Sequence, residues 1–66
     1  MLRNNLFNLM NQAVQESKSV WRIHNQYMQE AVGNDDLMIL WKKMEKQKEE
    51  SIIEMQNLIK KYNAQA

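Results

Sequence analysis

His24 is the one histidine of the sequence and the first residue with the chemistry of a catalytic base or a metal ligand. An imidazole titrates near neutral pH and is a common zinc ligand. Either role needs partners, yet the helical positions three and four residues before and after His24 carry no carboxylate. A zinc site with four ligands would need symmetry-related copies of the chain. We therefore predict that His24 is a packed, hydrogen-bonded core or interface residue and that no metal is bound.

Lys48 and the carboxylates around it are the second candidate for chemistry. A lysine buried on an apolar stripe can act as a base. More often its stem lies over apolar neighbours while the ammonium reaches water or a carboxylate. The acidic residues of this segment are Glu45, Glu49, Glu50 and Glu54. Because they spread over more than one helical face, we interpret them as solvated side chains and predict no catalytic residue here.

The composition excludes most other chemistry. There is no cysteine, which excludes disulfides, thiolate metal sites and cysteine nucleophiles. No Gly-rich phosphate loop and no Ser/His/Asp set is recognisable. We predict that the protein is not an enzyme and uses no cofactor.

Charge and hydropathy also limit the partners. Nine basic residues against eight acidic ones create no strong field toward nucleic acid or anionic lipid, so a nucleic-acid partner is disfavoured. No apolar run is long enough for a signal peptide or a membrane span. The sequence therefore predicts a cytoplasmic protein with no membrane partner.

One break organises the chain. The stretch from Val32 to Asp36 contains the only glycine, Gly33, in a sequence without proline. Glycine can take the left-handed conformation that ends a helix, Asn34 can cap the next helix, and acidic residues suit its first turn. We predict an all-α chain, a single domain over residues 1–66. Its parts are a helix at about 4–32, a turn at 33–35 and a helix at about 36–62, folded as an antiparallel hairpin.

Each half has apolar residues at helical spacing. In the first half, two heptad series are expected to form the core seam: Phe7, Val14, Trp21 and Met28, with Met10, Ser17, His24 and Ala31. A third series lies beside it: Leu6, Ala13, Val20 and Tyr27. The matching stripe of the second half is Leu37, Trp41, Met44, Lys48, Ser51, Met55, Leu58 and Tyr62. Folding about the break then predicts a polar core layer of Ser17, His24, Lys48 and Ser51, a device that can fix register or oligomeric state.

The apolar arc of the first half spans roughly 160°, whereas a single helix contact needs about 100°. Two helices of about 28 residues would be about 42 Å long, which exceeds the ~28 Å width of a compact domain of this size. We therefore expect a homodimer in which two hairpins form a four-helix bundle, acting through self-association and protein–protein interaction. A further protein partner is left open. The predicted dimer and core interface is Leu6, Val20, Trp21, Tyr27, Met38, Trp41, Ile52, Met55 and Ile59.

The segment from Leu40 to Met55 resembles the second helix of a ferritin-like hairpin, of the rubrerythrin kind or of small hairpin proteins from spore-forming bacteria. In that family this helix carries Glu-x-x-His for a di-iron site. Here Glu50 is followed three residues later by Ile53, so the histidine is missing. Glu16 in the first helix does not restore the set, and neither does Glu30. The resemblance implies the bundle without the iron chemistry, and one alternative function is a degenerate ferritin-like protein with a ligand pocket.

The architecture is also similar to plasmid-encoded RNA-binding helical hairpins, which dimerise into four-helix bundles and bind RNA through polar side chains of the first helix. The corresponding face here includes Gln15, Lys18, Arg22 and Asn25. Two cations are few for binding phosphates. An RNA-binding dimer is therefore a second alternative to the interaction protein that we favour.

Overall fold

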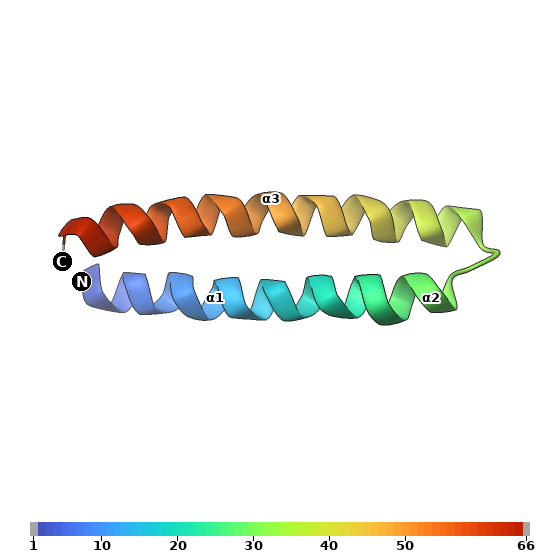
Figure 1. Ribbon diagram of the computed structural model, residues 1–66, viewed down its shortest axis with the longest axis horizontal. Coiled ribbons are helices and arrows are strands. Elements are labelled where there is room, and N and C mark those ends of the chain that lie inside the picture. The colour runs from blue at the N-terminus through green and yellow to red at the C-terminus, as the bar shows by residue number, and fades with distance from the viewer. Residues whose placement is uncertain (1, 66) are drawn as a thin grey trace.

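The computed structural model describes residues 2–65, which fold into two helical arms joined by a turn (Figure 1). The first arm consists of α1 (Leu2–Arg22), the π-helical turn η1 (Ile23–Tyr27) and α2 (Met28–Glu30), and the second is α3 (Asp35–Gln65). The predicted all-α class is confirmed for these residues. The two ends of the predicted domain, Met1 and Ala66, lie outside the described residues.

The arms lie side by side and run in opposite directions, so that both ends of the chain are at the same end of the molecule (Figure 1). The molecule measures 49 × 14 × 14 Å. The first arm begins two residues before the expected position 4 and ends at Glu30. It ends there because Ala31 leaves helical geometry, with φ −88° and ψ 2°.

The turn has the geometry that its residue types favour. Gly33 has a φ of 92°, a conformation that side chains other than glycine rarely adopt. The Asn34 N–H donates to the carbonyl of Ala31 at 2.9 Å. The Asn34 carbonyl in turn accepts from the Met38 N–H at 3.0 Å, which places Asn34 at the N-cap of α3. Asp36 lies in the first turn of α3, where its carboxylate suits the helix dipole.

The seam between the arms holds the core. Among residues 3–64, the buried apolar side chains are Ile23, 1% exposed, and Ala31, 3% exposed. The partly buried residues of the first arm are Leu6, Leu9, Ala13, Glu16, Ser19, Val20, Tyr27 and Met28. Those of α3 are Met38, Trp41, Met44, Glu45, Lys48, Ile52, Met55, Ile59 and Tyr62. Spacings of three and four residues dominate both sets, as expected where two helices pack along their length.

The predicted seam of α1 is wrong by one helical position. Phe7 is 68% exposed and Trp21 64% exposed, and Met10 and Val14 are also exposed. The series predicted to lie beside the seam, which is Leu6, Ala13, Val20 and Tyr27, is the one that packs in the seam. Leu9, Glu16 and Ile23 lie between its members and complete the buried side of the first arm.

The π-helical turn explains why Met28 and Ala31, the last residues of the predicted seam, are nevertheless covered between the two arms. A π-helical turn adds one residue to an α-helix and rotates everything that follows it. The regular heptad that reaches Ile23 would bury Glu30 next. With the extra residue in η1, Ala31 takes that place and Glu30 is exposed.

The polar core layer is not formed within the hairpin. Ser17, His24 and Ser51 are exposed, and only Lys48 is partly buried. The Ser17 hydroxyl donates to the carbonyl of Ala13 at 2.8 Å, one helical turn back, so it is satisfied without a partner across the seam. Ser17 and His24 follow the same one-position error as Phe7 and Trp21. Ser51 belongs to α3, where the predicted stripe is also wrong at Leu37 and Leu58, since each of these three exposed residues directly precedes a partly buried one.

Candidate functional site

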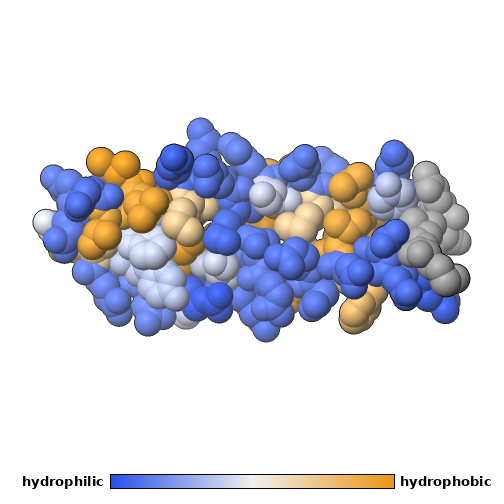
Figure 2. Space-filling model, turned by 180° about the vertical axis from the view of Figure 1, so that it is seen from behind, coloured by the Kyte–Doolittle hydropathy of each residue, from blue (hydrophilic) through white to orange (hydrophobic). Residues whose placement is uncertain are grey.

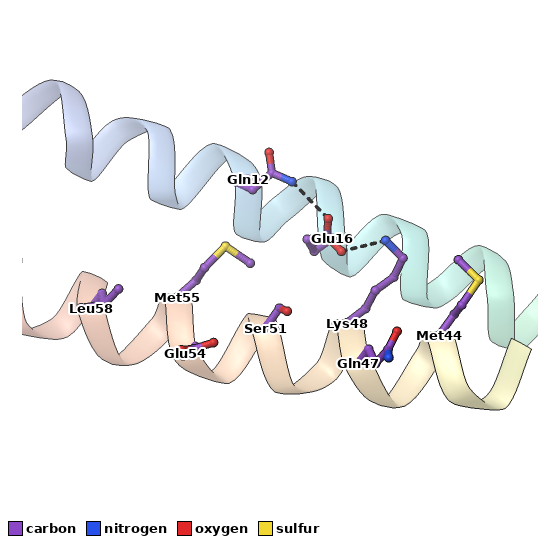
Figure 3. Close-up of a pocket in the computed structure, with 9 residues that line it drawn as sticks. All are labelled: Gln12, Glu16, Met44, Gln47, Lys48, Ser51, Glu54, Met55 and Leu58. Carbon is purple, nitrogen blue, oxygen red and sulfur yellow. Dashed lines mark hydrogen bonds and ion pairs between the residues drawn. The ribbon is translucent and has the colours of Figure 1, made fainter. Parts of the chain in front are cut away.

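A groove of about 630 Å³ runs along one face between α1 and α3. Figure 3 shows its lining from both helices, which is Gln12, Glu16, Met44, Gln47, Lys48, Ser51, Glu54, Met55 and Leu58. Methionine and leucine side chains form its apolar part, and the polar side chains gather near its middle. The groove is therefore an amphipathic surface with one defined polar centre.

That polar centre is an ion pair across the seam. The Lys48 Nζ donates to the Glu16 Oε2 at 3.0 Å, and the Gln12 Nε2 donates to the other oxygen of Glu16 at 3.1 Å (Figure 3). The hydrogen bond from the Lys48 ammonium, with its charge, lowers the pKa of Glu16, although partial burial acts in the opposite direction. Both charged groups are thus paired with each other, and the Lys48 ammonium reaches a carboxylate as its long stem allows.

His24 also has a carboxylate partner on the opposite arm. Its Nδ1 lies 3.0 Å from the Oε2 of Glu45. The imidazole is largely exposed, whereas Glu45 is mostly covered at the seam. Among residues 2–65, no group of three or more His, Cys, Asp or Glu side chains is placed to hold a metal ion. This pair can link the arms and orient the ring.

Glu16 and Glu45 are the two residues of these charged pairs that the sequence does not predict. Spacing within one helix gives no partner for His24, because Glu45 is 21 residues away on the opposite arm. Heptad spacing was the available signal, since Glu16 lies seven residues from both Leu9 and Ile23. Glu45 likewise precedes Ile52 by seven residues. A charged residue at a seam position predicts a charged partner across the seam.

An aromatic pair packs near the turn. The rings of Tyr27 and Trp41 have centroids 5.0 Å apart and planes tilted by 38°. Together with Ala31 they line a smaller hollow beside the first turn of α3. Such a pair contributes about 0.5–1.5 kcal/mol beyond the area that it buries. It therefore anchors the arms next to the turn.

Apolar side chains are also exposed on both arms, and Figure 2 shows them as separate orange areas divided by blue polar side chains. We call Phe7, Met10, Val14 and Trp21 the α1 flank. They recur at helical spacing along one side of α1. The groove contains Gln12, which lies on the opposite side of the seam from the α1 flank. The α1 flank therefore does not line the groove. Further exposed apolar residues are Val32, Leu37, Ile39, Leu40, Ile53 and Leu58.

The predicted interface residues divide between the seam and the surface. Eight of the nine are partly buried between the two arms of the same chain: Leu6, Val20, Tyr27, Met38, Trp41, Ile52, Met55 and Ile59. Trp21 alone is exposed. The residues of the suggested RNA face, Gln15, Lys18, Arg22 and Asn25, are also exposed. The Asn25 amide, in the middle of η1, donates to the Trp21 carbonyl at 3.0 Å, so part of its hydrogen-bonding capacity is already used.

Comparisons with protein-family models, with curated proteins and with solved structures return no match to this chain. The ferritin-like and RNA-binding resemblances therefore stay predictions. No helix within residues 2–65 is both long enough and apolar enough to cross a membrane.

Proposed function

We propose that this chain is a non-enzymatic self-association module, in which two antiparallel hairpins pair into a four-helix bundle that holds or docks other proteins. The observation that carries the proposal is the large apolar surface left exposed after the two arms have packed. Within residues 3–64, ten large apolar side chains remain exposed, and only two apolar side chains, Ile23 and Ala31, are buried. A single chain therefore covers only part of its apolar surface.

The size of the exposed surface supports a second copy. A folded monomer of 8.0 kDa is expected to have about 4,450 Å² of accessible surface. The molecule has 5253 Å², an excess of about 800 Å², and a standard protein interface buries about 800 Å² on each partner. The radius of gyration is 14.9 Å, against about 10.8 Å for a compact chain of this length.

The groove supports a binding role more than a catalytic one. Its two charged groups at the centre, Glu16 and Lys48, neutralise each other at 3.0 Å. The rest of the lining is amide, hydroxyl, carboxylate, methionine and leucine. Such a surface can position a partner, and it offers no nucleophile with an adjacent base.

Sedimentation equilibrium at several concentrations in the micromolar range tests the proposal. The expected result is a dimer of twice the chain mass of 8.0 kDa, which dissociates on dilution. Circular dichroism on the same samples checks that the helices are formed. A folded species that keeps the mass of one chain at every concentration would refute self-association.

A further inference from the structure

On the exposed surface of α1, one apolar stripe carries no Asp, Glu, Lys or Arg from Phe7 to His24, and Arg3 lies one helical turn before it. It comprises the α1 flank with Ser17 and His24, which continue the same spacing. On α3, the exposed leucines Leu37, Leu40 and Leu58 have no exposed aromatic side chain among them, and the exposed isoleucines are separated by charge. Between Ile39 and Ile53, the residues on the same side of the helix include Lys42, Lys46 and Glu49. The core of an interface is depleted in charge, so α1 offers the better contact surface.

The α1 flank also supplies much of the area that a dimer needs. An aromatic side chain buries about 200 Å² when fully covered. Phe7 is 68% and Trp21 64% exposed, so these two rings alone present about 260 Å². That is about a third of the ~800 Å² that each partner contributes to a standard interface. Met10 and Val14 lie between the rings and extend the same surface.

The charges of α1 set the direction in which a second copy can pack. Lys18 and Arg22 are exposed beside the flank, in the C-terminal half of α1. Two parallel copies would place each of these cations next to its own counterpart. In two antiparallel copies Lys18 lies near Ala13 and Arg22 near Leu9 of the second copy, in an N-terminal half whose only charged residue is Arg3. Like charges in contact are destabilising, so the antiparallel arrangement is favoured.

One register covers the whole stripe. With a twofold axis between residues 15 and 16, Met10 meets Trp21 of the second copy and Val14 meets Ser17 of the second copy. Phe7 then lies beside His24 of the second copy. A thioether against an aromatic ring is itself a favourable contact. Sliding the copies by one heptad places Trp21 against Arg3 in one direction and Phe7 against the buried Ala31 in the other, so one of the two rings loses its exposed partner.

We infer that the dimer forms through this stripe, with α1 of one copy antiparallel to α1 of the other and the axis between residues 15 and 16. The inference rests on the proposed self-association and assigns its surface, direction and register. The groove between the arms stays open in such a dimer, because it lies on the other side of α1.

Paired substitutions test the surface. Phe7→Gln with Trp21→Gln removes both rings of the α1 flank, and Ile39→Gln with Ile53→Gln is the matched control on α3, where the side chains are 68% and 57% exposed. We expect the first pair to weaken dimerisation at least 100-fold and the second to change it by less than about threefold, as interface energy concentrates in aromatic anchors. Equal effects of the two pairs, or a larger effect of the second, would overturn the assignment.

Spin labels test direction and register without disturbing the apolar residues. The chain has no cysteine, so single labels can be attached at Asn11→Cys and at Asn4→Cys, two exposed positions outside the stripe. Helix geometry predicts about 17 Å between the two copies at position 11 and about 36 Å at position 4. Short distances at both positions would indicate a parallel pair, and long distances at both would indicate contact through α3. Either result rejects this interface while self-association stands, whereas a wild-type monomer rejects both proposals.

Discussion

Replacing Ile23 by alanine should remove a large share of the stability of the fold. Ile23 is 1% exposed and belongs to η1, so its side chain packs where the first arm changes its helical geometry. The substitution deletes three carbon atoms at about 0.8 kcal/mol each and leaves a cavity, which together amount to about 3 kcal/mol. A domain of this length has a free energy of unfolding of about 3–10 kcal/mol.

Urea unfolding followed by the helical circular dichroism signal measures this loss. Wild type and variant are compared at the same protein concentration, because dimerisation contributes to the apparent stability. Ile39→Ala is the matched control, since Ile39 is 68% exposed and a surface substitution costs within about 0.5 kcal/mol. If Ile23→Ala lowered the free energy of unfolding no more than Ile39→Ala does, the seam would not be the core of the molecule.

Three further predictions concern the ion pair, the turn and the π-helical turn. The pKa of Glu16 is lowered in the fold from its ordinary value of 4.5, so the unfolded chain takes up its proton at higher pH. The pair with Lys48 therefore adds stability above pH 4.5, at most about 1 kcal/mol for an ion pair near the surface, which is lost as the pH falls through the folded-state pKa. Urea titrations from pH 7 to pH 3 should show this loss, and Glu16→Gln should abolish it. Gly33→Ala should cost about 1–2 kcal/mol in thermal or urea unfolding, because alanine is strained at a φ of 92°. Deleting the exposed residue Gln26 should convert η1 to regular α-helix and cost less than about 1 kcal/mol, since Ala31 stays in the seam. Deleting Asn11 should cost at least about 2 kcal/mol, because it replaces two leucines of the seam with asparagines. Equal urea midpoints for the two deletions would contradict the role given to η1.

The helical class was accessible from the sequence because every local preference agrees with it. A chain with no proline and one glycine has one natural break, and residues with high helix propensity fill both sides. The conformation of Gly33 follows from the same reasoning, since few other residues tolerate a positive φ.

The seam was not accessible in the same way because α1 has two adjacent apolar series. Phe7, Val14 and Trp21 form the more apolar series, and hydrophobic patterning alone selects it. The structure places Leu6, Ala13 and Val20 against α3 instead. Smaller side chains let two helix axes approach more closely. The ion pair of Lys48 with Glu16 and the pair of His24 with Glu45 could be predicted only from the correct seam. The more apolar series gives a different seam, so it predicts neither pair.

The π-helical turn separates the two apolar series along the first arm. Before η1, the smaller series packs against α3 and the aromatic series faces outward. After η1 the chain is rotated by one residue, so Met28 and Ala31 of the outward series enter the seam next to the turn. The exposed residues of α2 are Gln29 and Glu30, which are polar and do not continue the outward apolar stripe. The α1 flank therefore ends where η1 begins, and a second helix that packs on it needs to extend no further than His24.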